Sequence, residues 1–279
     1  MNPKGHPLSH ASHEITSLQA KRLAIIGVGV IGRILIQRLQ LAGLRKQQLM
    51  VCDDDPVRGA RAQREFGLKV CPLSDACCRA DLWLICTPPK RVRPTLERIA
   101  SRLGEGQTVI SFAAGMSLSR LEATLPQPVA VVRIMPNALS LIGRGVNPVA
   151  YGRGCTLDVR MQVQAILNAL GESIVIEDDQ MDWAVGLTGA SMRWLLPVLE
   201  GMTQAGIDAG FSPTDARWMA AKMMAGVAAL ALETDLTFEE MKGLTSVQVV
   251  EEATIAEIFR EAAHRAKTLA ASLAEDEGG

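Results

Sequence analysis

The chain has 279 residues, enough for a sizeable core and for two domains. Its formal net charge is −1, so no overall field favours nucleic acid or an acidic membrane surface, and we expect neither as a partner. We also expect no membrane span, since no apolar run reaches the roughly 18 residues that one needs.

The cysteines and histidines indicate no metal site. Cys52 and Cys86 lie inside apolar runs, where a thiol behaves as a small hydrophobic group. The adjacent pair Cys77-Cys78 lacks the spacing of metal ligands. These features predict a reduced, cytoplasmic setting. Residues 1–20 hold most of the histidines and no apolar run fit for a signal peptide, so we expect a flexible N-terminal extension.

The segment 21–180 alternates short apolar runs with helical patterns. Because most of these runs are continuous rather than alternating, they indicate strands buried on both faces of a parallel sheet. We therefore predict an α/β fold, a Rossmann-type doubly wound parallel sheet, over 21–180. The predicted strands are 22–28, 48–53, 82–87, 108–113, 129–135 and 173–177, and the helices between them include 33–42, 95–103 and 158–170.

The segment 181–279 loses the strand signal and predicts an all-α domain. Pro197 is expected to kink one helix. Ser212 and Pro213 form a start signal for the next, and Thr237 starts a short helix. The apolar stretch 219–232 has little polar relief, so its helix must be buried, either in a homodimer interface or within one subunit.

A glycine loop follows the first predicted strand as Gly27-Val28-Gly29-Val30-Ile31-Gly32. The pattern G-x-G-x-x-G is weak alone, but here it directly follows a strand and opens a helix. Gly27 allows the tight turn, Gly29 lets the backbone approach a pyrophosphate, and Gly32 lets helix and strand pack closely. With Val30 and Ile31 at the helix start, the loop predicts a dinucleotide site.

The second predicted strand ends in Asp53, where such folds place the acid that binds the adenosine ribose. Asp53 would accept hydrogen bonds from both ribose hydroxyls and repel a 2′-phosphate, which favours NAD. Arg58 and Arg61 follow closely, however, and could hold that phosphate. The cofactor is therefore predicted as NAD(P)H, with NAD and NADP both open.

Three further strand ends fall at the same edge of the predicted sheet. Thr87 and Pro88 follow one strand, Ala113 and Ala114 follow another, and Asn137 follows a third. The small residues at 113–114 would let a flat nicotinamide lie against the backbone. Asn137 would bind its carboxamide or the substrate, unless it only satisfies its own turn.

At this point the chain resembles the pyrroline-5-carboxylate reductase family. The glycine loop, the stretch "VISFAAGMSLSRLEATL" (109–125) and the stretch "VVRIMPNALSLIGRGV" (131–146) are similar to family motifs, the last to R-x-M-P-N-T-P. The resemblance implies reduction of a cyclic imine with NAD(P)H in proline biosynthesis. It also implies a helical domain that dimerises and completes the active site, so a homodimer or higher homo-oligomer is expected.

Departures from the family pattern leave the substrate open. The family's T-S-P-G-G-T-T loop, which holds the substrate carboxylate, is reduced here to Thr245-Ser246 followed by Val247. Ser246 would instead cap a helix running directly into Glu251-Glu252. Arg193 is a possible replacement clamp for an anion, or else a solvated arginine.

The predicted reaction is hydride transfer to a C=N bond of a small cyclic imine, which need not be pyrroline-5-carboxylate. A hydroxyl of Thr188, Ser191 or Thr245 would supply or relay the proton, although helix capping would also explain the first two. The alternatives are a regulatory or non-catalytic nucleotide-binding homologue that has lost the substrate loop, and a related reductase with another acceptor.

Overall fold

The structure, a computed structural model, describes residues 15–76 and 80–275. The chain divides into two compact units, which we call unit 1 (up to Gly189, together with the chain from Arg265 on) and unit 2 (Ala190–His264). The division into these units does not test the expected domain bounds, 21–180 and 181–279, which therefore remain a prediction. Most of the expected N-terminal extension, residues 1–14, and the pair Cys77-Cys78 lie outside the described residues. Leu18, in a 3₁₀ turn at Ile15–Leu18, is buried in the core of unit 1.

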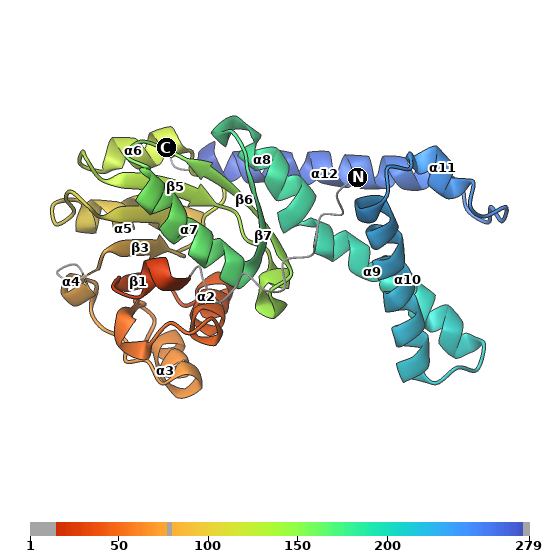
Figure 1. Ribbon diagram of the computed structural model, residues 1–279, viewed down its shortest axis with the longest axis horizontal. Coiled ribbons are helices and arrows are strands. Elements are labelled where there is room, and N and C mark those ends of the chain that lie inside the picture. Colours follow the sequence, from red (N-terminus) through yellow and green to blue (C-terminus); the bar gives the residue numbers. More distant parts are fainter. Residues whose placement is uncertain (1–14, 77–79, 276–279) are drawn as a thin grey trace. The chain divides into compact units, whose positions relative to one another are not determined.

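Unit 1 is built on one seven-stranded sheet with the order β2-β1-β3-β4-β5-β6-β7 (Figure 1). Every neighbouring pair is parallel except β5 and β6. The predicted α/β, doubly wound fold class is thus confirmed, with β6 and β7 running antiparallel to the first five strands. The strands are β1 (Leu23–Ile26), β2 (Leu49–Cys52), β3 (Leu82–Ile85), β4 (Thr108–Ser111), β5 (Ala130–Ile134), β6 (Gly145–Tyr151) and β7 (Gly171–Val175).

The strand β6 was not among the predicted strands. It is antiparallel to β5, with Val132 opposite Tyr151, and parallel to β7, with Pro148 opposite Ile174. Proline has no N–H for a ladder, so a proline inside a short segment argues against a central strand. The Pro148 carbonyl still accepts a 2.9 Å hydrogen bond from the Met135 amide, which keeps the strand in the sheet.

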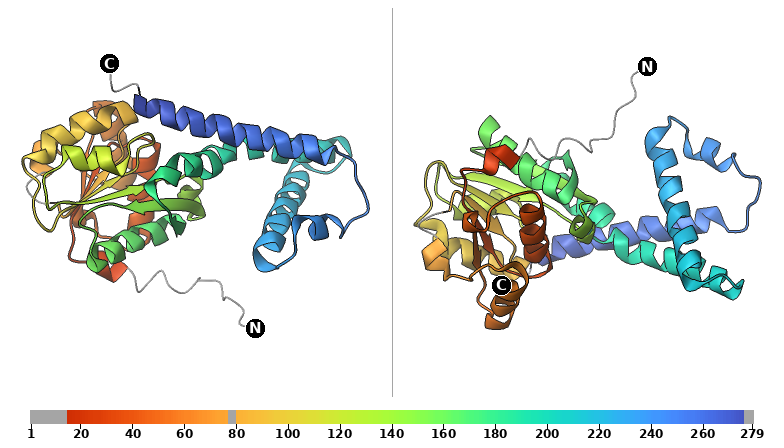
Figure 2. Two further views of the ribbon diagram at one scale, coloured as in Figure 1. Left: turned by 90° about the horizontal axis from the view of Figure 1, so that it is seen from above. Right: turned by 60° about the horizontal axis from the view of Figure 1, so that its bottom comes forward.

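Helices cover both faces of the sheet (Figure 2). Successive residues of a strand point to opposite faces, and the core divides accordingly. Ile25 and Leu84 pack with the helices α2 (Val30–Leu41) and α7 (Leu157–Leu170). Ile26 and Trp83 pack with α5 (Pro89–Ala100) and α6 (Leu118–Thr124) on the other face. The remaining short helices are α3 (Pro56–Phe66), α4 (Leu73–Ala76) and α8 (Met181–Ala184).

A buried arginine joins the sheet to the segment after β7. The Arg133 side chain is 3% exposed, and its guanidinium lies 2.9 Å from Asp178 and 3.5 Å from Asp182. Asp178 also accepts a 2.8 Å hydrogen bond from the Leu118 amide. The ion pair therefore holds β5, the start of α6 and the chain leading into α8 together.

Unit 2 is helical, in agreement with the predicted all-α domain. Its helices are α9 (Ser191–Asp208), α10 (Pro213–Glu233), α11 (Phe238–Lys242) and the first part of α12 (Glu252–Glu275). The start signals are confirmed, since Ser212 caps α10 with Pro213 in its first turn and Thr237 forms a capping box with Glu240. The helix α9 runs through Pro197. Among the described residues, no helix is long and apolar enough to cross a membrane.

Candidate functional site

The glycine loop between β1 and α2 has the geometry of a phosphate-binding turn. Gly27 has φ +95°, and a Cβ there would lie 2.9 Å from the Cys86 carbonyl oxygen. A Cβ on Gly32 would overlap the Gly27 carbonyl oxygen, so the helix and the loop are in backbone contact. Gly29 precedes α2 and provides no side-chain cap, and a Cβ there would have no atom within 4 Å. The open side of the loop therefore presents the helix N-terminus to an anion.

A pocket of about 730 Å³ lies at this edge of unit 1. Its walls come from the residues that follow the parallel strands β1, β2, β3 and β4, the edge at which doubly wound sheets bind ligands. Of the predicted cofactor residues, those that line this pocket are Gly27, Gly29, Val30, Ile31, Asp53, Thr87, Pro88, Ala113 and Ala114. Gly32 does not line it, since its place is beneath the loop.

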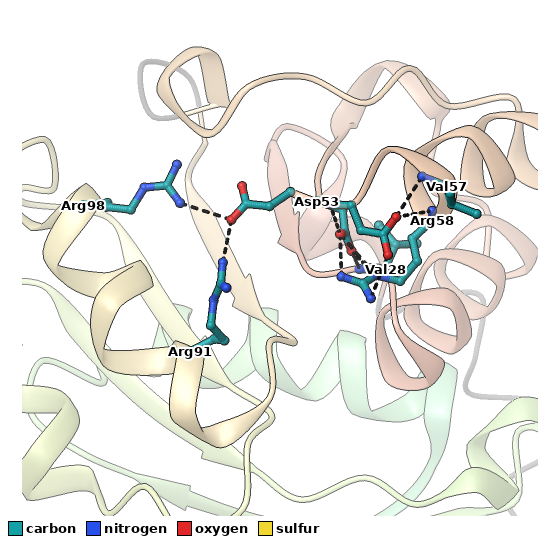
Figure 3. Close-up of polar contacts among 8 residues, drawn as sticks. Val28, Asp53, Val57, Arg58, Arg91 and Arg98 are labelled. Atoms are coloured by element: carbon teal, nitrogen blue, oxygen red, sulfur yellow. Dashed lines mark hydrogen bonds and ion pairs between the residues drawn. The ribbon is translucent and has the colours of Figure 1, made fainter. Parts of the chain in front are cut away.

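Asp53 is fixed at the end of β2 (Figure 3). One carboxylate oxygen accepts a 2.7 Å hydrogen bond from the Val28 amide, and the other a 2.8 Å bond from the Asp55 amide. The Arg58 guanidinium pairs with both oxygens at 3.0 to 3.2 Å. Burial alone would raise the pKa of Asp53, but the Arg58 pair and the two amides outweigh it, and the net pKa is lowered. The group is therefore a stable carboxylate.

A second ionic group, which includes Arg91 and Arg98, also lines the pocket (Figure 3). Asp54 accepts hydrogen bonds from Arg91 at 2.8 Å and from Arg98 at 3.4 Å. Both arginines lie on α5 and line the pocket, yet the sequence interpretation did not include them. The predicted helix began only at Thr95, whereas α5 begins at Pro89. Starting it at the proline pair would have placed Arg91 and Arg98, seven positions apart, on one face toward the same edge.

The floor of the pocket holds one hydroxyl without a protein partner. The Thr87 hydroxyl oxygen, among the described residues, is buried and makes no hydrogen bond. A buried polar group without a partner is costly, so this hydroxyl fits a site that a polar ligand completes. Burial raises the pKa of the nearby Cys86 thiol, which favours its neutral form. The small side chains of Ala113 and Ala114 leave room against the backbone.

Asn137 does not line this pocket. It caps the 3₁₀ turn Ala138–Ile142, where its side-chain oxygen accepts a 3.1 Å hydrogen bond from the Leu139 amide. Its amide nitrogen donates to the Val146 carbonyl oxygen at 3.1 Å. The geometry thus matches the alternative interpretation, in which the side chain satisfies its own turn.

The predicted proton donors and substrate residues lie elsewhere in the chain. Thr188, in a π-helical turn at Val185–Gly189, donates a 2.8 Å hydrogen bond to the Ala184 carbonyl oxygen. The other four, Ser191, Arg193, Thr245 and Ser246, belong to unit 2, and none of the five lines the pocket of unit 1.

The expectation that Ser246 caps a helix running into Glu251 is wrong. The helix α12 begins at Glu252, and residues 245–251 form no helix. The run of β-branched residues there lowers the helix propensity. Arg193 is exposed in the first turn of α9, and Ser191 is the first residue of that helix.

The glycine loop, the fixed acid after β2 and the pocket at the carboxyl edge together define a dinucleotide-binding protein of the Rossmann type. Residues 22–115 match the family model "NADP oxidoreductase coenzyme F420-dependent", and residues 178–273 match "Pyrroline-5-carboxylate reductase dimerisation".

Relatives agree with both models. The chain is 31% identical to a pyrroline-5-carboxylate reductase of Mycobacterium tuberculosis over 218 residues, which covers 76% of this chain and 74% of the relative. It is 29% identical to that of Corynebacterium melassecola, over 92% of this chain and 98% of the relative. The chain belongs to the pyrroline-5-carboxylate reductase family.

Solved structures show the same fold. The pyrroline carboxylate reductase of Plasmodium falciparum, with NADP bound, has a TM-score of 0.82 at 17% identity, covering 92% of this chain and 99% of that one. The Coxiella burnetii enzyme has a TM-score of 0.78 at 21% identity, covering 91% and 99%. The family confirms the predicted NAD(P)H cofactor and an NAD(P)-dependent oxidoreductase.

Proposed function

We propose that the chain reduces a C=N bond of a small cyclic imine with NAD(P)H, as a homodimer or higher homo-oligomer. The observation that supports this best is the pocket at the carboxyl edge of β1 to β4, which combines an open glycine loop, an ionised Asp53 and the small residues Ala113 and Ala114. Pyrroline-5-carboxylate is the first candidate substrate, since relatives over most of the chain bear that enzyme's name.

The bound dinucleotide supplies the hydride, and the residues of the pocket hold it. The Gly29 loop and the first amides of α2 bind the pyrophosphate, and Asp53 binds the adenosine ribose. The buried hydroxyl of Thr87 donates to a polar atom of the cofactor, which removes the penalty of its unpaired state. Ala113 and Ala114 leave the backbone accessible to a flat ring. These tasks are positional, so the site requires no strong acid of its own.

A hydroxyl supplies the proton to the reduced nitrogen in this proposal. Thr188 is the first candidate, because it belongs to the irregular π-helical turn Val185–Gly189, and such turns occur often at functional sites. Its hydroxyl donates a 2.8 Å hydrogen bond to the Ala184 carbonyl oxygen, which fixes the oxygen in this turn, and the hydroxyl would exchange this bond to give its proton to the substrate nitrogen. Ser191 and Thr245 are the alternative donors.

The substrate carboxylate is assigned to Arg193, with Ser246 as a secondary polar contact. Arg193 is an exposed guanidinium at the start of α9, which suits bidentate binding of a carboxylate. Asn137 is already engaged with its own turn, so its contribution would be to shape the loop after β5 rather than to donate directly.

Self-association is supported by the surface of unit 2. Large apolar side chains are exposed on its two longest helices in the single chain, among them Leu196 and Val198 on α9 and Trp218, Met223 and Val227 on α10. Soluble monomers rarely expose so many together. Because residues 178–273 match a dimerisation model, we propose that a second copy of the chain buries these side chains.

The decisive experiment mixes the purified full-length protein with NADH or NADPH and pyrroline-5-carboxylate, and then with a panel of other cyclic imines. Loss of the reduced-nicotinamide absorbance measures turnover. Thr188→Val should lower kcat at least about tenfold while cofactor affinity is unchanged. Thr203→Val is the matched control, because Thr203 makes the same bond to the carbonyl four residues back, at 2.7 Å. Failure to turn over any imine would reject the proposal.

A second candidate is a nucleotide-binding homologue without reductase activity. It is favoured by the segment 245–251, which has no glycine and no residue with positive φ, so its consecutive amides do not form a nest for a carboxylate. Tight cofactor binding without turnover on the whole imine panel would establish it.

A further inference from the structure

The adenosine end of the pocket contains three carboxylates and three guanidiniums that neutralise one another (Figure 3). The carboxylates are the consecutive Asp53, Asp54 and Asp55 after β2. Asp53 and Asp55 pair with Arg58, while Asp54 pairs with Arg91 and Arg98. Such an arrangement bears on one question about the cofactor, namely whether the adenosine ribose carries a 2′-phosphate.

The Asp53 carboxylate cannot turn away from an incoming ligand. Its side chain is 3% exposed, and each oxygen is held by a backbone amide, one from the glycine loop and one from its own turn. In this fold the acid at the end of the second strand lies at the ribose hydroxyls. A 2′-phosphate would therefore meet a fixed negative charge in a partly desolvated place, where like charges repel strongly.

The arginines do not compensate for that charge, because each already has an acidic partner. Arg58 lies over Asp53 at 3.0 Å and contacts Asp55 at 3.1 Å. Arg91 and Arg98 converge on the single carboxylate of Asp54 at 2.8 and 3.4 Å. A phosphate would gain these cations only by breaking existing ion pairs, which leaves their aspartates beside it.

We infer that this pocket selects NADH over NADPH, with Asp53 as the specificity-determining residue and Asp54 as the group that keeps Arg91 and Arg98 from binding a 2′-phosphate. The inference rests on the proposed function for its biological use, and it concerns cofactor binding alone. For NADH, Arg58 moves off Asp53 while keeping its ion pair with Asp55, and leaves the Asp53 carboxylate to the two ribose hydroxyls. Its long side chain is 53% exposed, so this movement needs no change in the backbone.

The test is direct titration of the full-length protein with NADH and with NADPH at low salt and without substrate, followed by nicotinamide fluorescence or calorimetry. We expect NADH to bind at least about tenfold more tightly. Asp53→Asn keeps an oxygen for one amide but removes the charge, and should weaken NADH and strengthen NADPH. Asp54→Asn should raise the affinity for NADPH about tenfold more than the affinity for NADH, since it frees two guanidiniums for the 2′-phosphate.

Two matched controls separate the local effect from a change in net charge. Glu97→Gln removes an acid of similar exposure (56% against 58% for Asp54) from an ion pair with Arg93 on the same helix. Glu65→Gln likewise removes an acid from its ion pairs, here on α3, where Glu65 pairs with Arg33 and Arg61. Neither acid lines the pocket, so neither control should change the ratio of the two affinities.

The outcomes are distinct from those of the imine assay. Equal or tighter binding of NADPH by the unsubstituted protein overturns the inference. So does a ratio of NADPH to NADH affinity that is the same in Asp54→Asn as in Glu97→Gln. Absence of binding of both cofactors also overturns it. A protein that prefers NADH yet reduces no imine retains the inference and loses the proposed reaction.

Discussion

Two glycines of the phosphate loop should respond in opposite ways to the same substitution. Gly32→Ala puts a methyl group into the Gly27 carbonyl, with the Cβ 3.1 Å from the carbonyl carbon, so the loop or α2 must shift. Overpacking of this kind costs about 1–3 kcal/mol of unfolding free energy. Gly29→Ala meets nothing within 4 Å, and the φ of −70° at Gly29 suits alanine. Its effect on stability should therefore stay within about 0.5 kcal/mol.

Cofactor affinity should respond in the opposite order, with a larger loss in Gly29→Ala than in Gly32→Ala. The methyl group of Gly29→Ala occupies the open side of the loop, where the pyrophosphate needs close backbone approach, and we expect NADH affinity to fall by at least about tenfold. Urea unfolding measures the stability of each variant, and a titration followed by nicotinamide fluorescence measures its affinity. Gly104→Ala is the matched control, since a Cβ there also meets nothing within 4 Å and Gly104 does not line the pocket.

Either of two results would refute this reasoning. If Gly29→Ala binds NADH as tightly as the unsubstituted protein, the pyrophosphate does not lie on this face of the loop. If Gly32→Ala unfolds at the same urea concentration as Gly104→Ala, the contact between the helix start and the Gly27 carbonyl is not a tight constraint.

Three other predictions concern the ion pairs and the helical unit. Asp178→Ala should lower the free energy of unfolding by about 3 kcal/mol or more, because it leaves the buried Arg133 without its nearest partner. Arg133→Met should lower it by less, since no buried charge is left unpaired. Urea unfolding that gives the opposite order of stability would contradict this. The pKa of Asp53 is lowered below the unfolded value of about 3.9, so its ionised form stabilises the fold above about pH 4 and this contribution disappears as the pH falls through the folded pKa. An acid titration of stability should be flatter for Asp53→Asn. Met223→Glu, at a side chain 60% exposed in the single chain, should shift the protein to monomer in light scattering, and an unchanged mass would argue against α10 as the interface.

The cofactor half of the site was predictable because its determinants are local. Gly27 and Gly32 are required by backbone geometry within one β-α turn, and Asp53 follows a strand whose apolar residues mark it clearly. Parallel strands bring their carboxyl ends to one edge, so strand order alone places Thr87 and Ala113 beside the loop. Five of the seven strands in fact follow that pattern along the chain, up to β5.

The misses have physical causes of two kinds. The strand β6 contains Pro148, and the rule against proline in a central strand was overridden because neighbours on both sides supply the remaining hydrogen bonds. Arg98 lay inside the predicted helix, but its pairing with Arg91 on one face depends on where α5 begins, and helix boundaries are less certain in sequence than helix interiors. An error of six residues at that boundary left the pocket-lining Arg91 outside the predicted helix.

The substrate residues differ because their determinants are not local. The proposed proton donor Thr188 would be recognised by what surrounds its oxygen, and the contact that the local chain geometry fixes is the one to the Ala184 carbonyl of its own helical turn. The same bond at Thr203 has no catalytic meaning, so the sequence pattern cannot separate the two threonines. What does separate them is the π-helical turn, which widens the helix by one residue and changes the direction of the side chains that follow. The comparison of Thr188→Val with Thr203→Val therefore tests whether backbone irregularity, rather than residue type, marks the catalytic position.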